Sequence, residues 1–265
     1  MSLIEEHFKL HKPPFPQTAE GTAVLHHTGI KEAHERLRFA IDRDGIAVLS
    51  GESGCGKSTV LGGIVRDLDP VQYHVVYTSL ATLGPFGLLA NLVAKLGLRV
   101  RRFKSEAAHD LVAHLRGLSK RAVVIIDEAH VMPDKSLEDL RLLTADSVQQ
   151  KSPFALILAG QPLLRERLSE PQHYALAQRV TVRVRLRPLT DSDVALFLDK
   201  HLRACGATKS LFEPDAVLLI FQHSRGIPRL AQALALAALY AAANAGKKNV
   251  DADSVQHAVL DMESA

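Results

Sequence analysis

A glycine-rich stretch over residues 51–58 has the residue types and spacing of a phosphate-binding loop. Its sequence, GESGCGKS, fits the pattern G-x-x-x-x-G-K-[ST], in which glycines let backbone N–H groups approach phosphate oxygens. Lys57 is expected to reach the β- and γ-phosphates of a nucleotide, and Ser58 to hold Mg²⁺. We therefore predict that this stretch binds ATP with Mg²⁺. The residues expected to contact ATP here are Gly51, Ser53, Gly54, Cys55, Gly56, Lys57, Ser58 and Thr59.

Two carboxylates, Asp127 and Glu128, follow the apolar run at 122–127. Neighbouring strands lie about 4.8 Å apart, so Asp127 is expected near the phosphate loop, where it helps to hold Mg²⁺ through water. Glu128 is then placed to orient or deprotonate an attacking water. The pair favours hydrolysis over transfer to a bound acceptor. An ordinary acidic N-cap of the next helix is the alternative.

Two further side chains could sense the reacting phosphate. Gln161 follows the apolar run at 154–160 and could hold the attacking water, or it could cap the next helix. Arg229 follows Pro228, which suits the first position of a helix, so Arg229 could touch the γ-phosphate and couple nucleotide state to the second domain. A surface arginine at a helix start is the alternative.

Arg179 stands between a helix-like segment and a strand-like segment. An always-charged guanidinium at a domain edge can donate to the γ-phosphate of a neighbouring subunit. Arg165 and Arg167 are rivals for this role, and a solvated arginine at a helix end is the alternative.

Cys55 lies inside the phosphate loop, near the start of a predicted helix. The pKa of a thiol tends to fall at such a position. We therefore expect oxidation or alkylation of Cys55 to block ATP binding.

Hydrophobic periodicity predicts the strands and helices that carry these residues. Continuous apolar runs predict central parallel strands, and helical patterns between them predict an α/β domain. The expected strands are 45–51, 73–80, 122–127, 154–160 and 179–186, and the expected helices are 57–68, 85–97, 106–119 and 134–150.

After residue 188 the pattern predicts helices alone. We expect them at about 191–204, 214–223, 228–244 and 251–261, with Thr190 or Asp191 and Asp251 as caps. The predicted domains are therefore an α/β domain at 1–188 and a helical domain at 189–265. In the last strand Val180, Val182 and Val184 alternate with arginines, which is typical of an edge strand.

Composition sets further bounds. The 265 residues carry a net charge of +3 and two cysteines, so an anionic partner is permitted and no disulfide framework is expected. The N-terminus lacks the apolar core of a signal peptide. The longest apolar stretch, 230–245, is shorter than the ~20 residues of a membrane helix. We expect no membrane span and a cytoplasmic location.

In this order the phosphate loop, IIDEAH, a polar residue after the fourth strand and GIPR in a helical domain resemble the AAA+ ATPases. The resemblance implies a five-stranded parallel sheet of order 5-1-4-3-2, a C-terminal all-α lid, and a nucleotide site between subunits. It implies that Arg179 is an arginine finger and Arg229 is sensor 2. Gln161 takes the sensor 1 position, where many members have Asn or Thr. The N-terminal segment, with Thr28 and Gly29, would lie near the adenine.

The resemblance is closer to the ExeA-like branch, through HFKLHKPPFP, LAGQPLLRERL, LAQRVTVRVRLRPL and GIPRLAQALALAAL. That branch includes ExeA-type secretion proteins and transposition ATPases of the TnsC, TniB, MuB and IstB type. Secretion-type members carry a membrane span and a peptidoglycan-binding module after the ATPase, whereas this sequence ends at Ala265, so we expect a transposition-type member. Such a member is an ATP-dependent homo-oligomer, a ring or a filament, that selects target DNA, recruits a transposase and disassembles on hydrolysis.

A basic segment, LRVRRFK at 98–104, is the expected DNA-binding surface. It lies between the helices predicted at 85–97 and 106–119, a helix pair that resembles initiator-type AAA+ proteins. Phosphate contacts need lysine and arginine and read no base edge, which suits sequence-tolerant binding of double-stranded DNA. A solvated charged loop is the alternative. The candidate residues are Arg99, Arg101, Arg102 and Lys104.

Two other functions stay open from the sequence. One is an export or cell-envelope ATPase that acts on protein partners, which would hydrolyse ATP without responding to DNA. The other is a stand-alone P-loop kinase, which would be monomeric and need a small acceptor. The helical domain with GIPR argues against the kinase.

Overall fold

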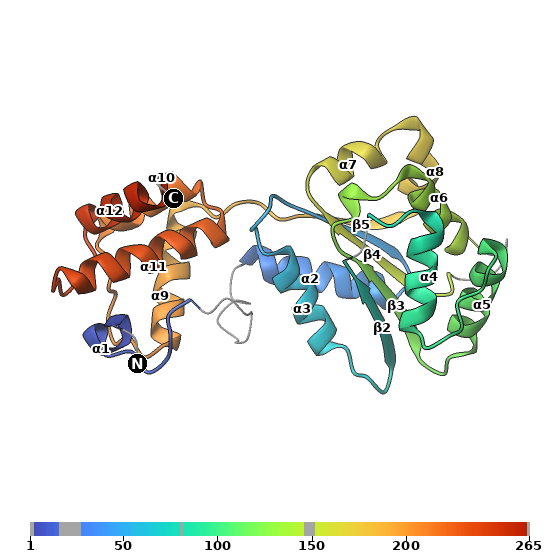
Figure 1. The fold of residues 1–265 in the computed structure, drawn as a ribbon, viewed down its shortest axis with the longest axis horizontal. Helices are drawn as coiled ribbons and strands as arrows, with labels where there is room; N and C mark the ends of the chain where they lie inside the picture. The colour runs from blue at the N-terminus through green and yellow to red at the C-terminus, as the bar shows by residue number, and fades with distance from the viewer. Residues whose placement is uncertain (1–2, 16–27, 80–81, 146–151, 264–265) are drawn as a thin grey trace. The chain divides into compact units, whose positions relative to one another are not determined.

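A computed structural model describes residues 3–15, 28–79, 82–145 and 152–263. These residues contain one five-stranded sheet with strand order β2-β3-β4-β1-β5, and every pairing is parallel (Figure 1). This confirms the predicted fold class and strand order. The strands are β1 (Ile46–Ser50), β2 (Tyr73–Thr78), β3 (Arg121–Ile126), β4 (Ala155–Gly160) and β5 (Val180–Arg185).

The burial of each strand follows its place in the sheet. β1 and β4 are buried along their whole length, as expected of central strands covered on both faces. In β5 the valines are buried while Thr181, Arg183 and Arg185 are exposed, and the strand pairs with β1 alone. The prediction of an amphipathic edge strand is therefore confirmed.

Helices cover both faces of the sheet (Figure 1). α2 (Thr28–Ile41) and α3 (Lys57–Asp67) lie on one face, and α4 (Pro85–Lys95), α5 (Lys104–Gly117) and α6 (Asp134–Leu143) lie on the other. Shorter helices follow β3 and β4: η2 (Ala129–Val131), α7 (Leu163–Leu168), η3 (Pro171–His173) and α8 (Tyr174–Ala177).

One helix expectation needs correction. α6 was expected to reach residue 150 but ends at Leu143, where the Thr144 hydroxyl turns back and donates to the carbonyls of Leu140 and Arg141. Residues 146–151 lie outside the described part of the chain. α1 (Leu3–Phe8) and α2 have no counterpart among the expected helices.

The C-terminal region is all-helical. α9 (Asp191–Ala204), α10 (Pro214–Ser224), α11 (Pro228–Asn244) and α12 (Ala252–Glu263) share one apolar core with Ile4, Leu10 and Phe15 of the N-terminal segment. Both predicted caps are present. Thr190 and Asp193 form a reciprocal capping box on α9, and Asp251 accepts from the backbone N–H of Ser254 at 3.0 Å.

By compactness the chain divides into two units, and neither is continuous in sequence. One combines the chain up to Ile30 with Glu52–Thr59 and with everything from Arg187 onward. The other comprises Lys31–Gly51 and Val60–Leu186, which include all five strands. The predicted domain boundary near residue 188 stays a prediction. Among the described residues, no helix is both long and apolar enough to span a bilayer.

Candidate nucleotide site

The phosphate loop joins β1 to α3. β1 ends at Ser50, the chain turns through the glycine-rich residues, and α3 begins at Lys57. Gly54 and Gly56 have φ angles of 82° and 97°, which side chains with a Cβ rarely adopt. Backbone N–H groups at the start of α3 are left without helical partners, and the helix dipole adds partial positive charge there. The loop therefore has the local geometry of an anion site.

The side chains of the loop also suit a phosphate group. Lys57 is 6% exposed, and its Nζ donates to the Glu52 carbonyl at 3.0 Å, so the ammonium lies along the loop. Ser53 and Ser58 are exposed, and Thr59 is half-buried in the first turn of α3. A cradle of glycines with one buried lysine and an exposed hydroxyl fits a nucleotide phosphate with a divalent cation.

Arg229 lies against this loop. Its backbone N–H donates to the Gly54 carbonyl at 3.3 Å, and a Cβ built on Gly54 would stand 2.9 Å from the Arg229 Cβ. Pro228 occupies the first turn of α11, as predicted, and Arg229 follows it with an exposed side chain. The helix that carries the predicted sensor 2 arginine therefore begins at the phosphate loop.

The start of α2 also lies near the loop. A Cβ built on Gly56 would contact the side chain of Ile30 at 3.4 Å, so the first turn of α2 borders the phosphate loop. Gly29 is half-buried in that turn. The backbone of Thr28 begins α2, whereas its side chain lies outside the described part of the structure.

Asp127 follows β3 and is held by two hydrogen bonds. Its Oδ1 accepts from the backbone N–H of Glu128 at 2.8 Å, and its Oδ2 accepts from the Tyr77 hydroxyl at 3.0 Å. Burial, reinforced by Asp127, raises the pKa of Tyr77 to about 12, so the hydroxyl stays a donor. Both oxygens of this buried carboxylate are therefore held in place by hydrogen bonds, and its role toward Mg²⁺ stays a prediction.

Glu128 has an unusual backbone. It lies in the left-handed region, with φ 55° and ψ 29°, and its side chain is about half-exposed. Few residues other than glycine adopt this conformation, and those that do often lie at functional sites. The Glu128 carboxylate makes no capping hydrogen bond to η2, so the alternative of an ordinary acidic N-cap is wrong.

Gln161 directly follows β4 and is half-buried. Its backbone carbonyl accepts from Leu164, whereas no side chain of the described residues caps the start of α7. The capping alternative is therefore wrong for its side chain, and a role toward water stays a prediction.

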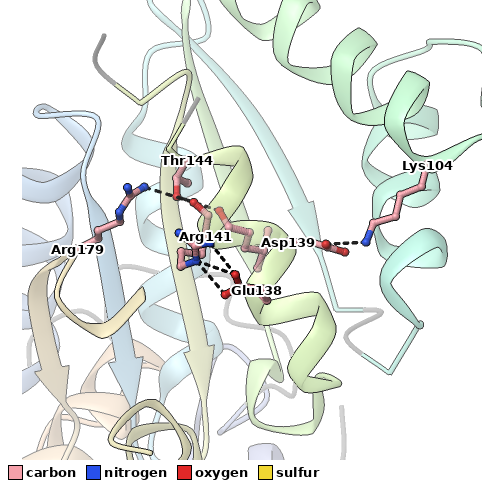
Figure 2. Close-up of polar contacts among 7 residues, drawn as sticks. Lys104, Glu138, Asp139, Arg141, Thr144 and Arg179 are labelled. Atoms are coloured by element: carbon pink, nitrogen blue, oxygen red, sulfur yellow. Dashed lines mark hydrogen bonds and ion pairs between the residues drawn. The ribbon is translucent and has the colours of Figure 1, made fainter. Parts of the chain in front are cut away.

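Arg179 is exposed between α8 and β5, and its Nη1 donates to the Arg141 carbonyl at the end of α6, at 3.3 Å (Figure 2). Its rival Arg167 is mostly buried, donates to the His130 carbonyl at 2.8 Å and forms an ion pair with Asp134. Arg167 is thus engaged within its own subunit. Arg165 is exposed.

The predicted DNA-binding residues differ in how they are paired. Arg101 Nε lies 2.6 Å from Oδ2 of Asp110, and Lys104 Nζ lies 2.6 Å from Oδ1 of Asp139 (Figure 2). Arg99 and Arg102 are exposed, and neither makes a side-chain hydrogen bond or ion pair within the described residues. Half of the expected basic surface is therefore partly neutralised by carboxylates.

Cys55 requires a correction. The thiol is buried, and this burial raises its pKa above the usual value, with Lys57 offsetting only part of the effect. The expectation of a lowered pKa at the helix start is wrong, because loss of solvation outweighs the favourable charges. The thiolate needed for alkylation is disfavoured here.

Two residues near the carboxylates were missed by the sequence reasoning. Tyr77 lies in β2 and supports Asp127, and His130 lies in η2 with Nδ1 3.7 Å from Oε2 of Glu128. The expected parallel pairing of the strands over 73–80 and 122–127 could have pointed to Tyr77. His130 could have been suspected from the motif DEAH itself.

Comparison with known proteins agrees with this geometry. Residues 40–168, just under half of the chain, match the family described as "AAA domain". General secretion pathway protein A of Aeromonas hydrophila is 32% identical over 255 residues, which cover 94% of this chain and 46% of that protein. The Holliday junction branch migration complex subunit RuvB of Clostridium kluyveri is 30% identical over 169 residues, covering 57% of this chain and 47% of that protein.

Among solved structures, the Aeropyrum pernix ORC1 protein in complex with DNA is similar, with a TM-score of 0.66, 20% identity, and coverage of 89% of this chain and 64% of that one. At this identity the likeness concerns the fold alone. The chain spans about half the length of the two curated relatives. None of these four descriptions mentions transposition.

Proposed function

We propose that this chain, an ATPase with an AAA domain and the AAA+ fold, is a nucleotide-gated switch that assembles into a homo-oligomer when ATP is bound. The observation that carries the proposal is the contact between the phosphate loop and α11. The Arg229 backbone N–H donates to the Gly54 carbonyl, which supports a coupling between occupancy of the loop and the position of α11. In many nucleotide switches, contacts with the γ-phosphate order a segment of the protein, and hydrolysis releases it.

In this proposal each residue of the site has one task. Lys57 and the loop N–H groups hold the phosphates, while Ser58 and Asp127 hold Mg²⁺. When bound, Mg²⁺ would neutralise charge that develops on the phosphate oxygens. Tyr77 keeps Asp127 in place. Glu128 takes a proton from the attacking water, and Gln161 orients that water.

Arg179 completes the site of a neighbouring subunit. It is exposed on the surface of its own subunit, and among the described residues its guanidinium bonds a single backbone carbonyl, that of Arg141. The Arg179 guanidinium pairs more strongly with an anionic phosphate, which attracts it by charge, than with a neutral carbonyl. ATP would therefore favour assembly, and hydrolysis would favour disassembly.

The partner we propose first is double-stranded DNA, in the cytoplasm, with a transposase recruited by the assembled form. Arg99 and Arg102 offer exposed guanidinium groups for phosphate contacts, which suits sequence-tolerant binding. One of the similar proteins supports a DNA partner: the relative from Clostridium kluyveri is a subunit of a Holliday junction branch migration complex.

A protein partner in export is the second candidate. It is favoured by the similarity to a general secretion pathway protein, which covers 94% of this chain. Under this candidate Arg101 and Lys104 stay paired with Asp110 and Asp139, and the basic loop serves solubility rather than DNA binding.

The test is the mass of the Glu128→Gln protein with ATP or ADP, each with and without random-sequence duplex DNA. Large complexes that require both ATP and DNA support the DNA switch. ATP-dependent assembly that ignores DNA supports the export candidate. A monomer under every condition contradicts the switch itself.

A further inference from the structure

His130 is buried beside the proposed base. It lies in η2, is 8% exposed, and places Nδ1 3.7 Å from Oε2 of Glu128. Within the described part of the chain, this Nδ1 has no hydrogen-bond partner. Buried polar atoms are usually satisfied, so an unpaired one aimed at a carboxylate needs an explanation.

The backbone of His130 is clamped from one side. Its carbonyl accepts from Arg167 Nη1 at 2.8 Å, and Arg167 is also paired with Asp134 in the first turn of α6. The buried His173 binds the same carboxylate, with Nε2 3.0 Å from Oδ1. Hydrogen bonds from Arg167 and His173 lower the pKa of Asp134, so the clamp stays charged near neutral pH.

β4 closes the other side. A Cβ built on Gly160 would stand 3.0 Å from the His130 backbone N and 3.3 Å from its Cβ. His130 thus lies between Gly160, which ends β4 and precedes Gln161, and Arg167, which binds the His130 carbonyl. The imidazole is buried on a backbone that is held from both sides, whereas the Glu128 side chain is half-exposed and has room to rotate.

We propose that His130 is a positioning residue for Glu128, donating Nδ1–H to its carboxylate. Rotation of the Glu128 side chain would shorten the 3.7 Å between Nδ1 and Oε2 to the length of a hydrogen bond. Holding Oε2 aims Oε1 at the attacking water, which gives up its proton to Glu128 while His130 keeps its own. This inference rests on the proposed role of Glu128 as the base.

The test compares three substitutions of His130 in the full chain. His130→Asn places an amide donor where Nδ1 stands, His130→Gln places it nearer Nε2, and His130→Phe fills the volume without a donor. We expect His130→Phe and His130→Gln to lower kcat for ATP hydrolysis by about ten- to a hundredfold, the usual effect of misplacing a reacting group. KM should stay within about twofold of the parent, and His130→Asn should retain most of kcat.

Two outcomes overturn the inference. If all three variants have the parental kcat, His130 has no role in hydrolysis. If all three lose kcat equally, His130 acts through packing rather than as a hydrogen-bond donor. If His130→Phe does not fold, as judged by its melting curve, the Asn and Gln pair decides the question, because both keep polarity and differ in donor position.

A parallel Glu128→Gln series separates this inference from the proposed function. If Glu128 is the base, adding His130→Phe to Glu128→Gln causes no further loss of kcat. If Glu128→Gln hydrolyses ATP at the parental rate, the assignment of Glu128 as the base is wrong, and the positioning role of His130 falls with it. If Glu128→Gln is inactive while His130→Phe and His130→Gln are fully active, only the positioning role fails.

Discussion

Lys104, the first residue of α5, is tied to Asp139 in the middle of α6, with Nζ 2.6 Å from Oδ1 (Figure 2). The other carboxylate oxygen of Asp139 is buried without a partner among the described residues. Releasing Lys104 to a DNA phosphate would therefore leave an uncompensated carboxylate, which is costly. Lys104 should therefore contribute less to DNA binding than its charge suggests. Arg101 should also contribute less, because it would have to give up its ion pair with Asp110.

The first prediction follows from this pairing. The double variant Arg99→Gln/Arg102→Gln should weaken binding to random-sequence duplex, and it should reduce the slope of log affinity against log salt by about two. Binding is measured by fluorescence anisotropy at several salt concentrations with a non-hydrolysable ATP analogue present.

Its control is Arg101→Gln/Lys104→Gln, which removes the same charge from the paired positions and should change the slope by less. Equal effects of the two double variants would mean that net charge, and not the exposed arginines, governs binding. If neither double variant changed DNA binding, the DNA-binding surface would lie elsewhere on the protein.

The second prediction concerns the phosphate loop. Gly54→Ala should abolish ATP binding, because Gly54 has φ 82° and an added Cβ would stand 2.9 Å from Arg229 Cβ. The left-handed conformation alone costs an alanine about 1–2 kcal/mol. Isothermal titration with ATP is the measurement.

Gly62→Ala in α3 is the matched control, since nothing lies within 4 Å of its added Cβ. Its free energy of unfolding should rise by up to about 1 kcal/mol, because alanine is the better helix former, and its ATP affinity should not change. Normal ATP affinity of Gly54→Ala would contradict the close approach of loop and helix.

The third prediction concerns the cap of α12. Asp251 accepts from Lys247 and from Ser254, and these hydrogen bonds, led by the one from Lys247, hold its pKa well below the usual range. Asp251→Ala should lower the free energy of unfolding by about 1 kcal/mol, the usual value of an N-cap. Chemical denaturation at neutral pH measures it.

The pH dependence has a definite sign. Because the pKa is lowered in the folded state, the stabilisation by Asp251 is complete above the ordinary aspartate pKa and is lost as pH falls toward the folded value. Asp253→Ala is the control, since Asp253 is largely exposed and lies 4.0 Å from Lys247. A similar loss in both variants would assign the effect to general charge rather than to the cap.

The strands of the sheet were predictable because local signals identify them. Continuous apolar runs identified the central strands, and the alternation of valine and arginine identified β5 as the edge. The resemblance to AAA+ ATPases supplied the strand order. The caps at Thr190 and Asp251 were also predictable, since a cap depends on residues within one turn.

Contacts between distant segments were not predictable. The ion pair of Lys104 with Asp139 and the clamp of Arg167 on His130 join residues more than 30 positions apart, and no periodic signal encodes them. Burial of Cys55 was missed for the same reason, so the pKa of its thiol was expected to move in the wrong direction. α1 and α2 are amphipathic helices beside segments rich in proline and histidine, which obscured their pattern.

Complementation between two inactive variants tests the shared site most directly. Lys57→Ala should abolish ATP binding, and Arg179→Ala should bind ATP without hydrolysing it, so neither hydrolyses ATP alone. Mixed oligomers contain interfaces that combine Lys57 of one subunit with Arg179 of its neighbour, and we predict that mixing the two proteins restores part of the steady-state ATPase rate. A mixture as inactive as its components, while light scattering shows that the two variants co-assemble, would contradict a nucleotide site completed by Arg179 of the next subunit.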